Sequence, residues 1–345
     1  MSRPTISTIT MADVARAAGV SQPTVSRALN GDARVATGTR LAILDTAERL
    51  GYVINRAART LAGSSTNSIG FVIAEHEAHV WGNPYIPRII AGISKELSAQ
   101  DKQLVLFVAQ NRHDQERLIK DVSRRRTVDG FLMITDNRSD RFLRFLLEQQ
   151  VPVVVGGRPL GFKQVSYVDV DNIGGAVAAT THLLDVGCTE VGMITGPRTT
   201  GPGVDRLAGY RRALRARGLK DNGAVYRAKD WGIDEGYAGM HQLLHEHPKL
   251  DGVFAAGELL ALGALSALRT AGKVVPDDVR FVGFDDSAAA SRSDPPLSCV
   301  AQPVEELGQQ MAALLLRRLA GEEKTGHLML PVQLNPRASS VGKDR

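Results

Sequence analysis

The feature that most constrains the fold of this 345-residue chain is an alternation of short apolar runs and amphipathic stretches that begins at residue 69. The first run, 69–74, has the length of a buried strand, and the stretch 86–97 has the periodicity of a helix. The alternation continues through 104–109, 115–124, 130–135, 142–149 and 151–155, and restarts through 176–184, 191–195, 206–216, 236–245, 252–256, 259–271 and 280–284. This pattern is typical of βαβ units, so we expect an α/β body of two doubly wound subdomains.

Two similar α/β halves predict a ligand cleft between them, at the carboxyl ends of their strands. The fold alone assigns no function, because many enzymes share it. The loop 196–203 lacks the lysine of a phosphate-binding loop, and no GxSxG motif or nucleophile with a base is present. We therefore expect neither enzyme activity nor a cofactor.

Metal and disulfide chemistry are also not expected. His241 and His245 are four residues apart but lack an HExxH glutamate and a third ligand, which favours a solvated helix face. Cys188 and Cys299 stand alone and are expected to be buried thiols. No apolar run could span a bilayer, and the N-terminus lacks a signal-peptide core, so we expect a cytoplasmic protein with no membrane partner.

The net charge of +5 is concentrated near the N-terminus. Residues 1–68 contain eight arginines and four carboxylates, a net charge of +4, which leaves about +1 for the rest of the chain. A small basic unit joined to a nearly neutral body suits a phosphate-binding head on a sensing or catalytic body.

The basic region has the pattern of a small all-α helix-turn-helix domain, predicted over 1–54. Thr10 can cap a first helix, 11–18, and Ser21 can cap a second helix with Pro23 in its first turn. A third helix begins at Thr37 or Thr39, and its expected core residues are Leu41, Leu44, Ala47 and Leu50. The residues left facing outward on the second helix, which enters the major groove in such proteins, are Gln22, Pro23, Ser26 and Arg27.

A hinge segment and linker are predicted over 55–68. Asn55 can cap a short helix that ends at Ala62, and a helix of this length is marginal alone. We expect it to fold only with a partner copy and DNA. Leu61 suits insertion into a widened minor groove, the alternative being that it packs on the domain surface.

These motifs carry a resemblance to a known family. The sequences Asp13-Val14-Ala15, Gly19-Val20-Ser21, Thr24-Val25-Ser26-Arg27 and Asn55-Arg56 resemble the DNA-binding head of LacI/GalR-family bacterial transcription regulators, and the similarity continues through nearly the whole chain. The resemblance implies that bases are read by Gln22, Pro23 and Arg27, with apolar readout at Pro23. The residues implied to contact or order the phosphate backbone are Thr10, Ser21, Thr24, Asn30, Arg34 and Asn55. Ala58 is a further DNA-binding candidate in the hinge segment, where Leu61 matches the minor-groove wedge.

The resemblance also implies that the body, 69–345, binds an effector and dimerises, with subdomains like those of periplasmic sugar-binding proteins. The chain would cross between subdomains near Asp171, Gln302 and Lys324. One subdomain would then contain about 69–170 and 303–324, and the other about 171–302 and 325–340.

Candidate effector-binding residues follow from the same resemblance. Arg206 matches an arginine that binds effector hydroxyls or carboxylate, although it could be a surface residue, and Asp285 matches a sugar-hydroxyl acceptor. Trp231 and Tyr85 could stack on a sugar or belong to the core. The other candidates near the cleft are Thr135, Arg158, Asp171 and Gln302.

One departure from the family pattern concerns the ligand. The family usually has Ala-Asn-Asp or Ala-Ser-Asp where this chain has Ala256-Gly257-Glu258. Gly257 lacks a polar side chain, and Glu258, also an effector candidate, carries its carboxylate one methylene farther. The effector can therefore differ from that of better-known relatives.

We expect a dimeric, sequence-specific DNA-binding regulator, nucleoid-associated when bound, that represses transcription from a palindromic operator. A small-molecule effector, a sugar or sugar derivative, would release it. The alternatives are a solute-binding or transport protein with the same body fold, or a regulator that uses a non-sugar metabolite as corepressor.

Overall fold

The computed structural model describes residues 9–29, 32–52, 66–73, 82–109, 111–124, 127–134, 140–322 and 325–341. The chain separates into two compact units, Met1–Ser64 and Ser65–Arg345, which we call the head and the body and describe separately. None of the helices in the described ranges is long and apolar enough to cross a membrane.

The described part of the head consists of the helices α1 (Met11–Ala17), α2 (Gln22–Leu29) and α3 (Thr37–Arg49). Thr10 caps α1 as expected, because the Asp13 N–H donates to Thr10 Oγ1 at 3.3 Å and the Thr10 N–H donates to Asp13 Oδ2 at 2.9 Å. Gly19 has a φ of +65°, which permits the tight turn into α2. The Thr24 N–H donates to Ser21 Oγ at 3.3 Å and so satisfies an otherwise unpaired group at the start of α2.

The inward face of α3 differs from the expected one. Ile43 is fully buried and Ala47 is 6% exposed, whereas Leu41 and Leu44 are 62% and 43% exposed. The prediction of a core that includes Leu41, Leu44 and Leu50 was therefore wrong, and only Ala47 was placed correctly. Apolar residues occur on both faces of this helix, so periodicity alone does not identify the buried face.

In the described ranges, the body contains two six-stranded sheets, one in each subdomain. The first sheet consists of β1 (Ser68–Ile73), β2 (Gln103–Val108), β3 (Gly130–Ile134), β4 (Val153–Gly156), β5 (Ser166–Val170) and β11 (His327–Leu330), in the order β11-β5-β4-β3-β1-β2. The second consists of β6 (Val191–Thr195), β7 (Val225–Arg227), β8 (Gly252–Ala255), β9 (Arg280–Asp285), β10 (Ser298–Ala301) and β12 (Gln333–Asn335), in the order β12-β10-β9-β8-β6-β7. Neighbouring strands are parallel, as the βαβ alternation predicts. The exception is the antiparallel pair of β10 with β12.

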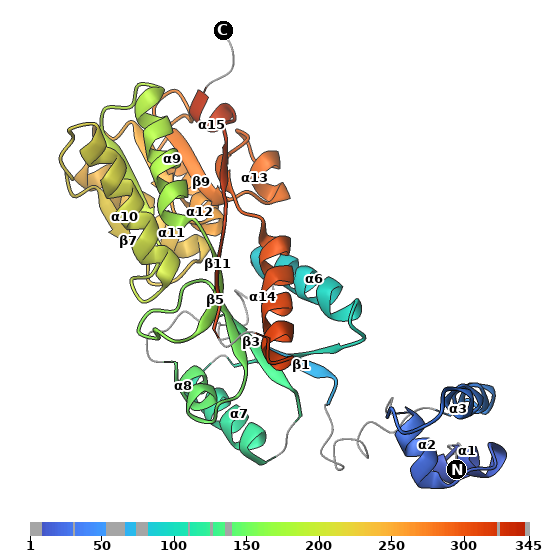
Figure 1. The fold of residues 1–345 in the computed structure, drawn as a ribbon. Helices are drawn as coiled ribbons and strands as arrows, with labels where there is room; N and C mark the ends of the chain where they lie inside the picture. Colours follow the sequence, from blue (N-terminus) through green and yellow to red (C-terminus); the bar gives the residue numbers. More distant parts are fainter. Residues whose placement is uncertain are drawn as a thin grey trace, which may run out of the picture. The chain divides into compact units, whose positions relative to one another are not determined.

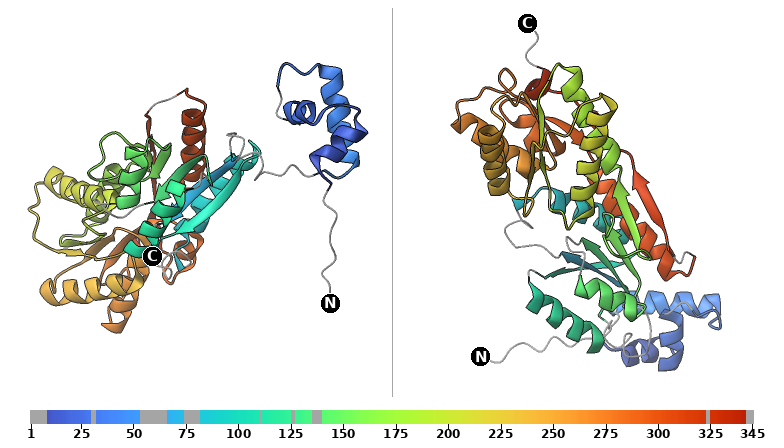
Figure 2. Two further views of the ribbon diagram at one scale, coloured as in Figure 1. Left: turned by 90° about the horizontal axis from the view of Figure 1, so that it is seen from below. Right: turned by 90° about the vertical axis from the view of Figure 1, so that its left-hand side faces the viewer.

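Helices cover the sheets of both subdomains (Figures 1 and 2). The helices of the first subdomain are α6 (Tyr85–Ser98), α7 (Arg112–Arg124), α8 (Arg141–Glu148) and α14 (Val304–Leu319). Those of the second are α9 (Asn172–Asp185), α10 (Gly201–Ala216), α11 (Ile233–Glu246), α12 (Glu258–Thr270), α13 (Ala288–Arg292) and α15 (Ala338–Val341). The central strands of each sheet are thereby buried among apolar side chains, which explains their nearly continuous hydrophobic runs.

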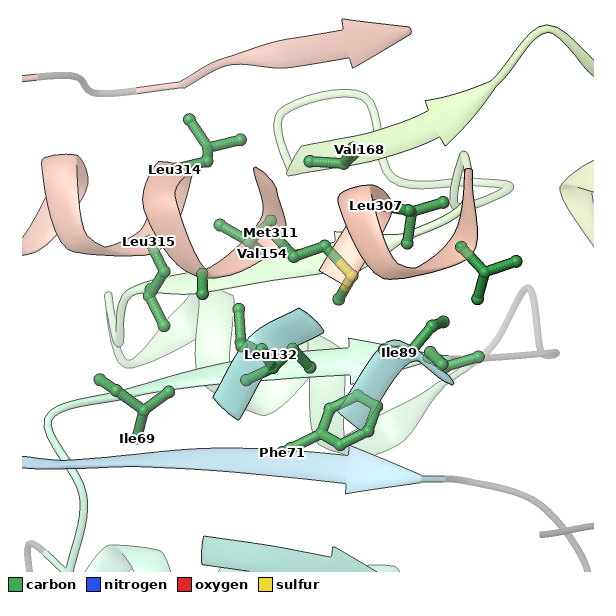
Figure 3. Close-up of a cluster of buried hydrophobic side chains, with 14 of the residues drawn as sticks. Ile69, Phe71, Ile89, Leu132, Val154, Val168, Leu307, Met311, Leu314 and Leu315 are labelled. Atoms are coloured by element: carbon green, nitrogen blue, oxygen red, sulfur yellow. The ribbon is translucent and has the colours of Figure 1, made fainter. Parts of the chain in front are cut away.

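The helix α14 anchors the first subdomain although it lies late in the sequence. Leu307, Met311 and Leu315 pack with Ile69 and Leu132 in one buried cluster (Figure 3). A Cβ at Gly308 would overlap the backbone carbonyl of Ile89, so glycine permits α14 and α6 to approach closely.

The chain passes between the subdomains at Asp171, at Gln302 and after β11. The third crossing lies later than the position near Lys324 that we expected, so 325–330 do not belong to the second subdomain. The reason is that β11 pairs with β5, with His327 opposite Tyr167 and Leu330 opposite Val170.

Candidate DNA-binding face and effector cavity

The helix α2 presents the predicted base-reading residues to solvent. Gln22, Pro23 and Arg27 are exposed, whereas Val25 is fully buried and Ala28 is 2% exposed. Ser26 is partly buried on the same helix. The local fold therefore leaves the face of α2 that carries Gln22, Pro23 and Arg27 open to solvent, as in helix-turn-helix proteins that place this helix in a major groove.

The predicted backbone-contacting residues that the structure describes lie at the surface of the head. Thr10, Ser21 and Arg34 are exposed, and the hydroxyls of Ser21 and Thr24 are 2.8 Å apart. The Arg34 guanidinium donates to both oxygens of Asp32, from Nε and from Nη2 at 2.7 Å, and this holds the pKa of Asp32 well below its usual range. Asn30, Asn55, Ala58 and Leu61 lie outside the described residues, as does Thr135 of the effector set.

In the body, a cavity lies between the two subdomains and holds about 760 Å³ of empty space, including its opening. The predicted effector residues that line it are Tyr85, Arg158, Arg206, Trp231, Glu258, Asp285 and Gln302. The other lining residues are Asn83, Ile134, Gly156, Gly157, Asp169, Gly201, Pro202, Gly257 and Leu259.

The sequence suggested Asp171 as a cavity residue, but the carboxylate that lines the cavity is that of Asp169. Asp171 does not line the cavity, because it precedes α9 and its Oδ1 accepts from the Gly174 N–H at 2.8 Å as a helix cap. Asp169, which the sequence analysis missed, lines the cavity and is 2% exposed. The sequence does contain a signal for Asp169, because a carboxylate near the carboxyl end of the apolar strand Ser166–Val170 lies where a cleft is expected.

Arg206 is a buried arginine on α10 and not a surface residue. Its Nε donates to Asn172 Oδ1 at 2.8 Å, and its Nη1 donates to the backbone carbonyl of Ala256 and lies 3.7 Å from Asp285 Oδ1. Its Cζ lies 3.6 Å from the centre of the Phe284 ring. Burial lowers the pKa of Arg206, although the Asp285 carboxylate opposes that shift.

Asp285 connects three parts of the cavity wall. Its Oδ2 accepts from the Glu258 N–H at 3.1 Å, and its Oδ1 accepts from the Gln302 side-chain amide beside Arg206. Its φ of +95° is unusual for a residue other than glycine. Such a fixed carboxylate, with neighbours that donate to it, is suited to orient a polar ligand group.

Trp231 forms an aromatic wall whose position depends on two glycines. A Cβ at Gly196 would overlap the indole, and a Cβ at Gly257 would lie 3.1 Å from its Cε3. Trp231 is partly buried, packs against the core of the second subdomain and also lines the cavity. It can therefore belong to the core and still offer a ring face on which a ligand could stack. Glycine at position 257, where the family usually has asparagine or serine, therefore leaves room for the indole of Trp231.

The carboxylate of Glu258 is directed to the protein more than to the cavity. Its Oε2 accepts from the Ser287 N–H at 2.6 Å and its Oε1 accepts from the Ser287 hydroxyl. Burial raises the pKa of Glu258 even though these hydrogen bonds oppose the shift. Glu258 thus braces the loop that follows Asp285.

An ion pair joins the subdomains beside the cavity. Arg158, after β4, donates from Nη2 to Asp205 Oδ1 at 2.6 Å and from Nε to Asp205 Oδ2 at 3.1 Å, and Asp205 lies on α10. The Arg158 N–H donates to Asp169 Oδ2 at 2.8 Å. Both guanidinium groups in the wall, Arg158 and Arg206, therefore already face carboxylates, and an incoming ligand meets no unneutralised positive charge.

Among the described residues, no group of three or more histidine, cysteine or acidic side chains could hold a metal ion. Cys188 and Cys299 are both buried free thiols, as expected. The described lining of the cavity contains no serine, threonine, cysteine, lysine or histidine side chain, so it offers no nucleophile–base pair of these types.

Comparisons with known proteins agree with this arrangement. The description "Bacterial regulatory proteins, lacI family" matches residues 10–55, and "Periplasmic binding protein-like domain" matches residues 180–340. The HTH-type transcriptional regulator CelR of Thermobifida fusca is 42% identical over 315 residues, 91% of this chain and 92% of that protein. The ribose operon repressor of Halalkalibacterium halodurans is 30% identical over 96% of this chain and 97% of its own length.

Solved structures extend the similarity. A complex of the transcriptional regulator CelR with cellobiose has a TM-score of 0.77 and 40% identity, covering 96% of this chain and 99% of that one. The lac repressor dimer bound to operator and an anti-inducer has a TM-score of 0.78 and 25% identity, covering 97% and 99%. These relatives are transcription regulators and not enzymes. The identity over nearly the full length confirms the resemblance found in the sequence: the chain belongs to the lacI family of bacterial regulatory proteins and is a DNA-binding transcriptional regulator.

Proposed function

We propose that this protein is a cytoplasmic repressor that leaves its operator, and with it the nucleoid, when a neutral disaccharide of the cellobiose type binds the cavity. The observation that carries the proposal is that the indole of Trp231 lines a cavity in which Arg158 and Arg206 both face carboxylates. A sugar has an apolar ring face that can stack on Trp231 and hydroxyls that can bond to Asp285 and Gln302.

The charges of the cavity favour a neutral ligand. Asp169, Glu258 and Asp285 are three carboxylates in the wall, opposed by the two guanidinium groups of Arg158 and Arg206. Asp205 pairs with Arg158 from behind the wall. A phosphate or carboxylate would have to displace an existing ion pair, whereas hydroxyls can donate to these carboxylates without doing so.

The similarity to the CelR–cellobiose complex supports a disaccharide. We assign the principal contacts to Arg206, Trp231 and Asp285, with Tyr85 and Arg158 on the opposite subdomain.

On the DNA side, we propose that two heads occupy the half-sites of a near-palindrome, related by the two-fold symmetry of a dimer. Gln22, Pro23 and Arg27 would read bases, and the segment that contains Asn55, Ala58 and Leu61 would respond to the effector. Because release from the operator requires the effector to favour a DNA-free form, the effector must bind that form more tightly.

The test begins with selection of bound duplexes from random-sequence DNA, which yields an operator. Fluorescence anisotropy of that labelled operator is then measured during titration with cellobiose, and with maltose, which differs only in its linkage. We expect release by cellobiose and weak release by maltose. Operator binding that no neutral disaccharide alters, but that a purine base or another non-sugar metabolite strengthens, would replace this proposal with corepression.

A further inference from the structure

A second concave site lies on the outside of the second subdomain, between α10 and the ends of β6 and β7. Four arginines line it: Arg198, Arg211, Arg215 and Arg227. We call it the arginine groove. It holds about 960 Å³ of empty space, including its wide opening, and no carboxylate is among its lining residues.

The charges of this groove are poorly compensated. Arg211 Nε lies 2.7 Å from Asp221 Oδ2, but within the described ranges no carboxylate pairs with Arg198, Arg215 or Arg227. The body as a whole carries only about +1, so four guanidinium groups around one hollow are a local concentration of charge. Gathering like charges without counter-ions raises the electrostatic free energy, and a bound anion would lower it.

The groove contrasts with the effector cavity, although both use α10. Arg206 points from α10 into the cavity and faces Asp285 at 3.7 Å, whereas Arg211 and Arg215 point from the same helix into the groove. A polyanion is disfavoured in the cavity, where carboxylates outnumber guanidinium groups, and favoured in the groove.

We propose that the arginine groove binds a small phosphorylated metabolite with more than one phosphate group, at a site separate from the effector cavity. Planar guanidinium forks bind phosphate oxygens in pairs, and arginines from two sides of a hollow can hold two phosphates at once. Val204 and Leu207, which also line the groove, would contact the organic part. The four arginines converge on one concavity, which suits a compact anion better than an extended nucleic acid.

The test is calorimetric titration of the full-length protein with inorganic pyrophosphate at low ionic strength. The double variant Arg198→Gln/Arg227→Gln should bind pyrophosphate about tenfold more weakly or worse, because two charge-assisted contacts are lost. Arg212→Gln is the matched control, since Arg212 is an exposed arginine on α10 that does not line the groove. Arg27→Gln controls for binding of pyrophosphate to the basic head. Both control variants should bind pyrophosphate with the affinity of the wild type.

Three further measurements complete the test. Thermal unfolding and operator affinity of the double variant should equal those of the wild type, and Arg198→Lys/Arg227→Lys, which keeps the charge without the fork, should bind pyrophosphate with intermediate affinity. The proposal is overturned if the wild type binds no pyrophosphate, or if Arg212→Gln weakens binding as much as the double variant. It is equally overturned if Arg27→Gln alone abolishes binding, because the head would then be the site.

Discussion

At the scale of single residues, the two glycines beside Trp231 should have separable roles. A Cβ at Gly196 overlaps the indole, so Gly196→Ala should lower the free energy of unfolding by about 1–3 kcal/mol through overpacking. A Cβ at Gly257 approaches the indole only to 3.1 Å, and the φ of −168° there suits any residue, so Gly257→Ala should unfold like the wild type. It should nevertheless weaken disaccharide binding, because the indole must shift. Urea unfolding and calorimetry on both variants check this, and equal losses of stability would contradict it.

Glu258 should make stability depend on pH. Burial raises its pKa above the ordinary value of 4.5, so the folded state holds the proton more tightly than the unfolded state. Its contribution to the free energy of unfolding is therefore complete below pH 4.5 and is lost as the pH rises through the raised pKa. Glu258→Gln does not titrate, so the wild type should lose stability relative to this variant as the pH increases. Urea unfolding from pH 4.5 upward measures the difference, and a constant difference would refute the assignment.

Single residues also show what the sequence could and could not predict. The resemblance placed Arg206, Asp285 and Trp231 correctly at one cavity, because helix and strand ends fix where such residues lie. It could not distinguish Asp169 from Asp171, since that choice depends on which carboxylate caps α9. Nor could it orient Glu258, whose hydrogen bonds to Ser287 span 29 residues of chain.

At the scale of elements, α10 couples the subdomains through Asp205, whose partner Arg158 follows β4. A double-mutant cycle with Arg158→Gln and Asp205→Asn should give a coupling free energy of up to about 1 kcal/mol in disaccharide binding, because Arg158 is partly exposed and the pair is screened. The same cycle on Arg217 and Asp185, an exposed ion pair within the second subdomain, is the control and should give none. Equal coupling in both cycles would show that the inter-subdomain pair has no special role.

The helix α2 should carry sequence discrimination by the head. Arg27→Ala should reduce the preference for operator over random duplex by about 1–3 kcal/mol, the usual value of a specific base contact. Arg49→Ala removes the same charge from α3, where Arg49 pairs with Asp45, and should lower affinity for both duplexes alike. Competitive gel shift separates the two effects, and a uniform loss in Arg27→Ala would make that residue a phosphate contact.

The strands and helices also differ in how far the sequence alone could predict them. The βαβ alternation correctly indicated two doubly wound sheets with parallel pairing, but not the antiparallel pair of β10 with β12. It succeeded because buried strands and amphipathic helices have distinct periods. The strand β11 was missed as part of the first sheet, since its pairing with β5 joins residues about 160 positions apart. The buried face of α3 was likewise decided by packing among the helices of the head and not by its own sequence.

At the scale of the whole molecule, the head and the body differ in charge and therefore in the ligands that they favour. The head carries +4 and the body about +1, and the cavity in the body contains an excess of carboxylates. Binding of the head to DNA should therefore weaken steeply with salt, whereas binding of a neutral sugar should not. The effector can thus act on DNA affinity only through conformation, because it adds no charge to compete with phosphate.

This division leads to a reciprocal prediction for the intact protein. If cellobiose lowers operator affinity by some factor, operator must lower cellobiose affinity by the same factor, because both paths close one thermodynamic cycle. Calorimetry with cellobiose, alone and with saturating operator, measures one side, and anisotropy with and without saturating cellobiose measures the other. Arg206→Ala, which removes the central cavity contact, should abolish the effect of cellobiose while leaving operator affinity without sugar intact. If neither titration is altered by the other ligand, sugar and operator binding are not coupled. Normal release by cellobiose in the Arg206→Ala protein would mean that the sugar acts at a site other than this cavity.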